Sequence, residues 1–342
     1  MSPRKKIFLS LLTVLVILSV WQWELLAYGW AQGRGQVYIV WNSKPLTEVL
    51  ADQSFPDSLK MRIETIEKAR EFAIQNLGLK DTDNYTTYYD QRGEPSLWNV
   101  TACRPFAFEP KTWWFPIVGE VPYKGYFDKE KAIKLAEQLK AEGWEVRVRP
   151  VGGWSTLGWF RDPILSSMLE RSEGELAELI IHELTHSTVF VKDQVTFNEN
   201  LASFIGEQGA RLFLRTHYGA SAVQLQQYLA EDADSRRFTA YILGATQQLD
   251  SLYKTFTDEI PVAEKQKKKD AAIAKIGDTL RELPFADRRY AEAFKNGKPS
   301  NAYFMSFLRY HSYGDSLQQV LSTQFEGDLR AFIIDVKERH GR

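Results

Sequence analysis

His182, Glu183 and His186 lie within five consecutive residues of the sequence His-Glu-Leu-Thr-His. If this stretch is helical, the two histidines share one face, and both imidazoles can bind the same metal ion. Glu183 lies one step around the helix, so its carboxylate can reach a metal-bound water without binding the metal. The spacing therefore predicts a metal site with zinc as the ion and Glu183 as the catalytic base.

The flanking residues predict the helix that this chemistry needs. Ser172 and Glu175 have the spacing of a capping box. An apolar stripe follows beside the histidines: Leu176, Leu179, Ile180 and Leu184. If the motif arose by chance, both histidines would be ordinary helix residues and Glu183 would be solvated. The agreement of the surrounding signals favours the metal site.

A catalytic zinc ion needs a third protein ligand and one open position. Glu199 is the candidate, because it lies near the start of an expected second helix and residues 187–197 are enough to turn the chain back. Glu207 lies about two helical turns further along, on broadly the same face. It is the alternative third ligand, or a partner for the amino terminus of a substrate.

These residues carry a resemblance to a known family. His182–His186 followed by Asn198-Glu199-x-x-Ala202 resembles the gluzincin metallopeptidases, in which two helix histidines and a glutamate hold zinc. Residues 155–163, Ser-Thr-Leu-Gly-Trp-Phe-x-Asp-Pro, resemble a narrower bacterial group of aminopeptidases. The likeness extends over residues 85–214. It implies a zincin-like fold, a Zn²⁺ cofactor and a peptide substrate.

The same resemblance assigns a substrate-binding role to the stretch ahead of the zinc helix. In zinc peptidases this stretch commonly forms a sheet edge to which an extended substrate adds through backbone hydrogen bonds. Ser155, Leu157 and Gly158 take that role by resemblance, and a plain loop is the alternative reading of the segment.

Composition excludes some classes of function. The net charge of the 342 residues is −1, so nothing in the charge balance indicates binding to nucleic acid. Cys103 is the one cysteine, so no intramolecular disulfide can form, and a buried free thiol is expected. The sequence does not determine an oligomeric state.

The first residues predict a membrane anchor. Arg4, Lys5 and Lys6 precede an almost wholly apolar run, Ile7–Val20, and Trp21 and Trp23 follow it. No small-x-small cleavage site stands out, which favours an uncleaved signal anchor over residues 1–28. The catalytic part would then lie in the cell envelope, outside the cytoplasm. The alternative is a cleaved signal and a secreted or periplasmic protein.

The remaining pattern predicts an α+β fold that is mainly α, with a small β-sheet and a C-terminal helical lobe. We expect an N-terminal helical region at 29–84, a zincin-like catalytic core at 85–219 and a C-terminal helical region at 220–342 with a helical hairpin. Residues 36–41 read as a short strand or as helix. The basic run Lys265–Lys269 reads as a solvated face, with anionic lipid as the alternative contact.

Further elements follow from periodicity. Helices are expected at 46–79 with a turn at Pro56, and then at 127–143, 201–218, 221–256, 261–283, 301–317 and 325–338. Strands are expected at 85–89, 98–102, 112–118 and 145–151.

Together these observations predict a zinc-dependent peptide hydrolase, with the aminopeptidase assignment resting on the resemblance alone. The alternatives are a catalytically silent zinc-binding envelope protein and a non-peptide zinc hydrolase. The presence of Glu183 argues against a silent site, which would need no base. The tetrahedral intermediate also needs an oxyanion donor. No spacing rule selects among the candidates: Tyr310, His311, Tyr313, His217 and Tyr218.

Overall fold

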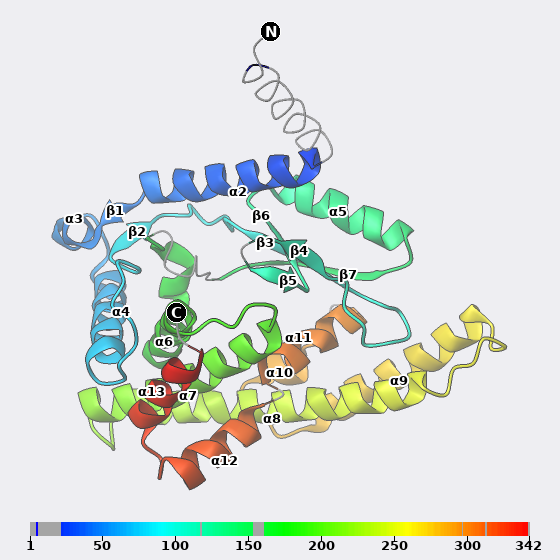
Figure 1. The fold of residues 1–342 in the computed structure, drawn as a ribbon. Coiled ribbons are helices and arrows are strands. Elements are labelled where there is room, and N and C mark those ends of the chain that lie inside the picture. Colours follow the sequence, from blue (N-terminus) through cyan, green and yellow to red (C-terminus); the bar gives the residue numbers. More distant parts are fainter. Residues whose placement is uncertain are drawn as a thin grey trace.

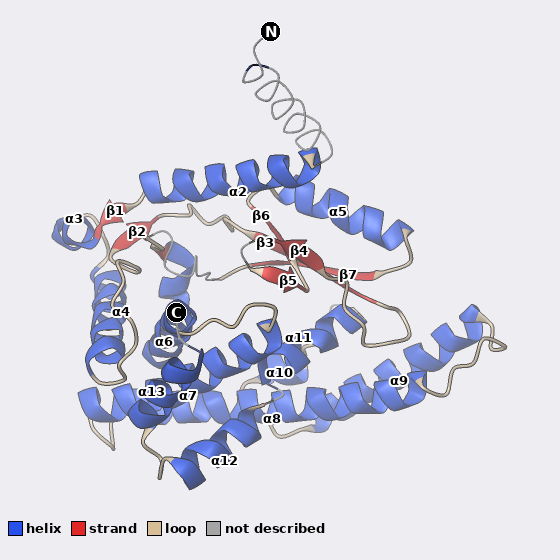
Figure 2. Ribbon diagram, viewed as in Figure 1, coloured by secondary structure: helices blue, strands red, loops and turns tan. Residues whose placement is uncertain are grey.

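The computed structural model describes residues 5, 22–116, 118–152, 161–295, 297–311 and 313–340. The chain is mainly helical with small sheets, which confirms the predicted class (Figures 1 and 2). The helices are α2 (Trp23–Trp41), α3 (Leu46–Ala51), α4 (Asp57–Gln75), α5 (Lys129–Ala141), the 3₁₀ turn η1 (Ser166–Glu170), α6 (Glu173–Thr188), α7 (Val195–Tyr218), α8 (Val223–Tyr253), α9 (Val262–Glu282), α10 (Arg288–Ala291), α11 (Asn301–His311), α12 (Gly314–Gln324) and α13 (Leu329–His340).

The strands form three small sheets. They are β1 (Lys44–Pro45), β2 (Thr87–Tyr89), β3 (Trp98–Cys103), β4 (Trp113–Phe115), β5 (Gly119–Val121), β6 (Lys124–Tyr126), β7 (Glu145–Pro150) and β8 (Ile164–Leu165). Their orders are β1-β2-β8, β6-β3-β7 and the hairpin β4-β5. In the second sheet β3 lies between two antiparallel neighbours. Strand β2 pairs in parallel with β8, which directly precedes the segment leading into α6.

Helix α5 covers one face of the β6-β3-β7 sheet. Ala132, Ala136 and Leu139 recur at helical spacing and are buried against Val100 and Ala102 of β3. The Asp128 side chain accepts a hydrogen bond from the Lys131 N–H and caps the helix. Helix α11 contacts β3 and β7 as well as α7 and α8, so it connects the sheet to the helical layer (Figure 1).

The main core surrounds α6 and α7. Helix α4 packs on α6, while α12 and α13 pack on α7. The buried side chains include Ile63, Ile66, Ile180, Ile181, Leu184, Ile205 and Phe213. Two glycines allow α7 to approach α6 closely. A Cβ at Gly206 would lie 2.9 Å from the Glu178 carbonyl oxygen and 3.2 Å from the Cβ of His182, and one at Gly209 would lie 3.0 Å from Ile181.

Helices α8 and α9 form the predicted hairpin, with a second core. Phe238, Ile242 and Leu249 of α8 pack with Ile276 and Leu280 of α9, and α11 adds Phe304. The expectation of a solvated face at residues 265–269 is wrong for Lys269, which is 1% exposed. Its Nζ donates to the Glu145 carboxylate at 2.5 Å and to the Pro105 carbonyl at 2.7 Å, because the hairpin packs onto the end of β7.

Of the two interpretations of residues 36–41, strand or helix, the structure confirms the helix: they belong to α2, because buried Gln36 and Ile39 continue its inner face. The helix expected at 301–317 divides into α11 and α12, since Asn200 of α7 holds the backbone on both sides of the break. Cys103 is a buried free thiol as expected, and burial raises its pKa to about 12.

Most of the predicted anchor lies outside the described residues, and the proposed domain boundaries stay a prediction. Within the described ranges, no helix is both long enough and apolar enough to cross a membrane.

Candidate metal centre

Helix α6 places His182 and His186 on one face. The helix begins with the predicted capping box: Ser172 Oγ accepts from the Glu175 N–H at 3.3 Å, and Glu175 Oε2 accepts from the Ser172 N–H at 2.9 Å. These bonds satisfy two of the backbone donors that a helix start leaves free. The apolar side of α6 is buried in the main core, so the histidines are turned toward α7.

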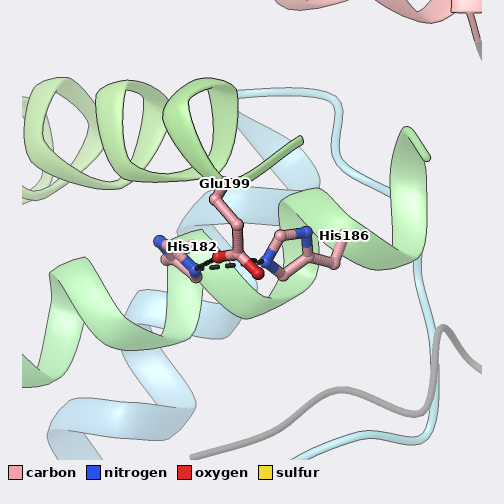
Figure 3. A group of neighbouring side chains, drawn as sticks. All are labelled: His182, His186 and Glu199. Carbon is pink, nitrogen blue, oxygen red and sulfur yellow. Dashed lines mark hydrogen bonds and ion pairs between the residues drawn. The ribbon is translucent and has the colours of Figure 1, made fainter. Parts of the chain in front are cut away.

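Asn198 sets the start of α7. Its side chain accepts from the Val191 N–H at 2.9 Å and donates to the Val191 carbonyl at 2.7 Å. This pair of bonds folds the connection between α6 and α7 back against the first turn of α7. The neighbouring residue, Glu199, then faces the two histidines (Figure 3).

Three ligand atoms converge at this point. The Nε2 atoms of His182 and His186 lie 3.2 Å apart. Glu199 Oε2 lies 3.6 Å from His182 Nε2 and 3.5 Å from His186 Nε2 (Figure 3). The three side chains keep exposed fractions of 17%, 10% and 13%, so solvent still reaches them. Among the described residues, His182, His186 and Glu199 form the group of side chains whose donor atoms lie close enough together to hold one metal ion.

The donor set fits zinc. A tetrahedral zinc ion with bonds of about 2.0–2.1 Å to nitrogen and oxygen spaces its ligand atoms roughly 3.3–3.4 Å apart. The three observed separations, 3.2, 3.5 and 3.6 Å, lie close to that spacing. Two imidazoles with one carboxylate are also the ligand chemistry of a catalytic zinc site, and the partial exposure suits an open fourth position.

Electrostatics couple Glu199 to the histidines. Burial raises the pKa of Glu199, but His186 and His182 outweigh burial and hold this pKa well below its usual range. Burial lowers the pKa of His186, and Glu199 more than reverses that effect. The carboxylate is therefore ionised at neutral pH, which is the form that binds a metal.

Glu183 is buried beside this group, with 7% of its surface exposed. Burial raises the pKa of its carboxyl, and Glu199 acts in the same direction, while His182 and His186 oppose them. A carboxylate whose pKa is raised from its ordinary value binds a proton more readily, as a general base requires.

Two tyrosines that sequence reasoning did not select reach the same environment. Tyr123 precedes β6, and Tyr310 lies near the end of α11. Burial and then Glu199 raise the pKa of Tyr310 to about 12 and also raise the pKa of Tyr123. Both phenols therefore keep their protons at neutral pH. Tyr310 was one of five open candidates, whereas no motif marked Tyr123.

Asn200 positions the Tyr310 segment. Its Nδ2 donates to the Arg309 carbonyl at 2.5 Å, and its Oδ1 accepts from the Tyr313 N–H at 2.8 Å. The side chain is buried, with 2% exposed. Asn198 and Asn200 flank Glu199 in the sequence, and each fixes a different segment around it. In the sequence, the one signal for these roles is that both side chains are amides, which can donate and accept hydrogen bonds.

Tyr85 is the third tyrosine near the site. It is fully buried in a left-handed backbone conformation with φ of 61°, and its hydroxyl has no hydrogen-bond partner within the described part of the chain. Burial raises its pKa, followed by the charges of Glu183 and Asp162. Strained backbone and an unsatisfied buried hydroxyl are both costly, and they concentrate at functional sites.

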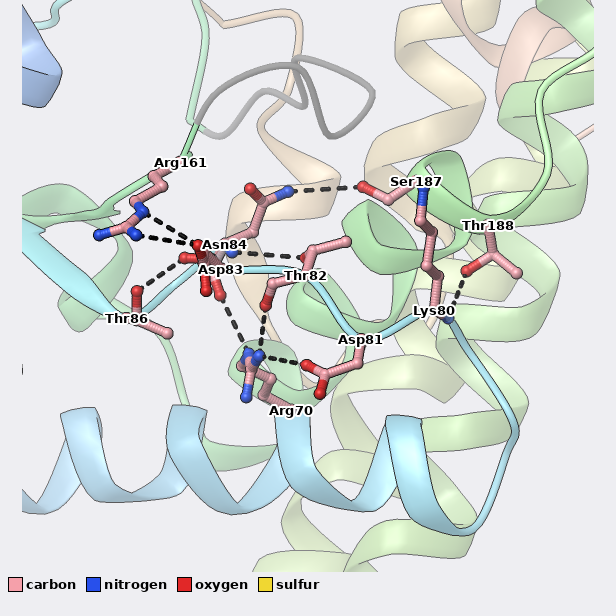
Figure 4. Close-up of polar contacts among 10 residues, drawn as sticks. All are labelled: Arg70, Lys80, Asp81, Thr82, Asp83, Asn84, Thr86, Arg161, Ser187 and Thr188. Carbon is pink, nitrogen blue, oxygen red and sulfur yellow. Dashed lines mark hydrogen bonds and ion pairs between the residues drawn. The ribbon is translucent and has the colours of Figure 1, made fainter. Parts of the chain in front are cut away.

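Residues 80–86 hold Tyr85 against the end of α6. The Lys80 N–H donates to Thr188 Oγ1 at 2.9 Å, and Asn84 Nδ2 donates to Ser187 Oγ at 3.4 Å (Figure 4). On the other side, the Asp162 N–H donates to Asn84 Oδ1 at 3.1 Å. This loop thus connects α6 to the residues that follow position 160.

The remaining predicted site residues are placed differently. Glu207 lies further along α7, where Arg236 of α8 donates to it at 2.8 Å, and it does not belong to the three-ligand group. Ser155, Leu157 and Gly158 lie outside the described residues. His217 and Tyr218 pack with Phe213 at the far end of α7, and Tyr313 is exposed.

The fold and the site thus define a mainly helical protein with a candidate metal centre of two histidines and one glutamate on adjacent helices. Residues 27–341 match the model of a family described as "Putative aminopeptidase". The chain belongs to this family, and the match includes the whole of the centre. Comparisons with curated proteins and with solved structures returned no match.

Proposed function

We propose that this protein is a zinc-dependent peptidase of the gluzincin type with a zincin-like core. His182, His186 and Glu199 would hold the metal, and Glu183 would be the general base. The observation that carries the proposal is the convergence of three donor atoms at 3.2, 3.5 and 3.6 Å beside a buried glutamate. Membership of an aminopeptidase family supports peptide hydrolysis.

Zinc bound here would supply a Lewis acid and a water of lowered pKa. Glu183 would accept a proton from the attacking water and later deliver it to the leaving amine, because its buried carboxyl binds a proton more readily than a solvated one. Tyr310 and Tyr123 keep their phenolic protons near the acidic group and are the candidate donors to the oxyanion. Of the five sequence candidates, Tyr310 is supported by its place in this environment.

An aminopeptidase must also hold the free amine of its substrate. Glu207 is engaged with Arg236, so we propose that it stabilises the helix pair rather than contacts substrate. Ser155, Leu157 and Gly158 remain our proposed contacts for the substrate backbone, on the basis of the family resemblance alone.

The test uses the purified full-length protein in detergent with two matched fluorogenic substrates, leucyl-aminomethylcoumarin and its N-acetyl derivative. We expect hydrolysis of the free-amine substrate, loss of activity with a zinc chelator, and recovery on addition of zinc. Glu183→Gln is the control for contaminating peptidases. Equal cleavage of blocked peptides would indicate an endopeptidase, and absence of any hydrolysis by the zinc-loaded protein would leave a silent zinc-binding protein.

We also propose that the protein is tethered in the cell envelope, with its catalytic part outside the cytoplasm. The basic residues before Ile7–Val20 support this orientation. A periplasm-dependent reporter fused after Arg342 should be active, and the protein should sediment with membranes. A mature N-terminus near residues 29–36 would instead indicate a cleaved signal.

A further inference from the structure

Helix α2 exposes a band of large apolar side chains. The exposed fractions are 68% for Trp23, 50% for Leu26, 77% for Trp30, 52% for Val37 and 87% for Trp41. At 3.6 residues per turn, positions 23, 30, 37 and 41 fall within roughly 40° of one another around the helix. The band therefore follows one face along the whole length of α2. Three aligned and exposed tryptophans are unusual on a protein surface that faces only water.

The opposite face fixes this orientation. The Tyr28 hydroxyl and Gln32 Nε2 both donate to the Gly125 carbonyl, each at 2.9 Å. The Tyr28 ring also stacks on Phe115, with ring centroids 5.4 Å apart. Ile39 is buried, with 2% exposed. Because polar and aromatic contacts hold the inner face on the body, rotation of α2 cannot bury the tryptophans.

This arrangement inverts the usual surface helix, whose apolar face is turned inward and whose polar face meets water. On α2 the inner face carries hydrogen-bonding groups, and the outer face carries tryptophans with a single charge beside them, Arg34. Figure 1 shows α2 along one edge of the molecule, with α8 and α9 along the opposite edge. The outer face of α2 is therefore accessible to a large flat partner.

We propose that the outer face of α2 lies in the headgroup layer of a lipid bilayer, with the helix parallel to the membrane plane. Tryptophan and tyrosine prefer this layer, since their rings are apolar and their N–H or O–H groups remain hydrated. Position in the chain supports lipid over a protein partner, because the apolar run Ile7–Val20 directly precedes α2 in the sequence. Helix α2 itself is not apolar enough to cross a bilayer, which suits a helix that lies on the surface.

Arg34 adds charge to this contact. It is exposed on the same side of the helix as the tryptophans, about one turn from Trp30 and from Val37 and about two turns from Trp41. Its guanidinium can bind the phosphate of an anionic headgroup while the tryptophans enter the interface. The body would then rest on the membrane through α2, with the α8–α9 hairpin pointing away from it.

The test compares two exposed valines in the full-length protein. Val37 lies on the α2 band and Val223 begins α8, with exposed fractions of 52% and 76%. Val37→Cys and Val223→Cys are each labelled with the environment-sensitive dye NBD and reconstituted in vesicles of phosphatidylethanolamine and phosphatidylglycerol. We expect a blue-shifted emission at position 37 that brominated lipids quench, and a water-like, unquenched emission at position 223. The buried Cys103 thiol is replaced by alanine in both variants.

Other outcomes overturn the proposal. Water-like emission at position 37 would show that α2 does not meet lipid. A blue shift at position 37 without quenching by brominated lipid would assign the face to a protein partner, including a second copy of the chain. Equal quenching at positions 37 and 223 would show unspecific contact.

A second set of variants tests the tryptophans themselves. Trp30→Ser combined with Trp41→Ser should reduce lipid quenching of the dye at position 37 several-fold, because the side chains that insert are removed. Trp114→Ser, at a tryptophan on β4 that is 59% exposed, is the matched control and should leave quenching unchanged. Unchanged quenching in the double variant, with unchanged helix content by circular dichroism, would contradict the proposal.

Discussion

Helices α6 and α7 contribute to two polar clusters that differ in how their charges are balanced, and α8 completes the second of them. The first is the candidate metal centre of His182, His186 and Glu199. The second, which we call the Glu178 cluster, consists of Glu178, Glu207, Arg211, Tyr228, Asp232 and Arg236. Glu178 precedes His182 by one helical turn, so the two clusters are neighbours on the same helices.

In the Glu178 cluster the chain supplies a donor to each carboxylate. Arg236 donates to Glu207 at 2.8 Å and to Asp232 at 2.9 Å. Arg211 donates to Asp232 at 2.5 Å, and the Tyr228 hydroxyl donates to Glu178 at 2.8 Å. Each carboxylate of this cluster is thus paired within the protein, as buried carboxylates in a structural network require.

At the metal centre the balance is different. Within the described residues, the ion-pair partners of Glu199 are the two histidines alone, and no arginine or lysine pairs with it. The two imidazole nitrogens and the carboxylate oxygen meet at a common point, where three acceptor groups favour a bound cation. The comparison teaches that the carboxylates on these helices are structural where an arginine or tyrosine of the chain donates to them, and that Glu199, whose ion-pair partners are only histidines, is the candidate metal ligand.

The largest expected effect separates Glu199 from Glu207. Glu199→Ala should weaken zinc binding by more than about 100-fold, beyond the loss seen for residues that only support a ligand. Glu207→Ala should leave zinc affinity within a few-fold of wild type, because Glu207 is paired with Arg236. The measurement is a competition titration against a chromogenic zinc chelator. A collapse of affinity in Glu207→Ala with an unchanged Glu199→Ala would reverse the assignment of the two clusters.

The proposed catalytic base gives the next effect. Glu183→Gln should keep zinc and reduce turnover by roughly 10²- to 10⁴-fold, because the amide cannot accept the proton. Mass spectrometry measures whether zinc is retained, and steady-state kinetics on the same preparation measures the loss of turnover. Wild-type turnover in this variant would exclude Glu183 as the base.

Tyr310→Phe tests the oxyanion donor. We expect kcat to fall by roughly 10²- to 10³-fold with little change in KM, since a donor to the oxyanion acts mainly in the transition state. Tyr313→Phe is the matched control, because Tyr313 is exposed at 42%. If Tyr310→Phe and Tyr313→Phe have equal kinetics, Tyr310 is not the oxyanion donor, and Tyr123 becomes the candidate.

Tyr85→Phe removes a buried hydroxyl without a hydrogen-bond partner in the described structure. Removing an unsatisfied polar group should leave the free energy of unfolding unchanged or raise it by about 1 kcal/mol. If the hydroxyl serves the site, turnover should still fall by about 10-fold. A chemical denaturation curve and kinetics together test this, and a loss of stability without a change in turnover would give Tyr85 a purely structural role.

The smallest effect is a pH dependence in the Glu178 cluster. Burial, followed by the charge of Glu207, raises the pKa of Glu178 from 4.5 to about 8, with Asp232 and Glu175 adding to it and the Tyr228 hydroxyl opposing it. The folded protein therefore holds a proton that the unfolded chain releases, and this contribution to stability is lost as pH rises from about 4.5 to about 8.

Glu178→Gln removes this titration and can still accept the Tyr228 hydrogen bond. Relative to wild type, the variant should gain on the order of 1–3 kcal/mol in the free energy of unfolding between pH 5 and pH 9. Urea denaturation of both proteins at the two pH values, with a chelator present to remove any contribution from metal, gives the comparison. A constant difference across this range would contradict a buried, protonated Glu178.

The sequence predicted those parts of the site that depend on local structure. The capping box and apolar stripe fixed α6, and helical periodicity then placed His182 and His186 on one face with Glu183 beside them. Asn198-Glu199 near the start of α7 indicated the third donor. The strand β7 and helix α5 also formed where alternation and helical spacing predicted them.

Contacts between distant residues could not be read from such patterns. Tyr310 reaches the surroundings of Glu199 because α11 packs on α7, and Asn200 bonds to a carbonyl 109 residues away. Tyr123 reaches them from the segment between β5 and β6, which is also distant from Glu199 in the sequence. Lys269 looked like part of a solvated basic run, but packing of the hairpin pairs it with Glu145, 124 residues away. No local spacing encodes either contact.

The sequence by itself determined which helix carries the two histidines of the candidate metal centre, because helical geometry depends on neighbouring residues only. The sequence favoured Glu199 over Glu207 as the third donor, but only the tertiary structure brings it to the histidines, since that contact depends on how closely α6 and α7 pack. Gly206 permits the close approach, and Arg236 from α8 pairs with Glu207 and leaves Glu199 to the histidines. The outward orientation of the α2 tryptophans has the same origin, because contacts to Gly125 fix the inner face of that helix.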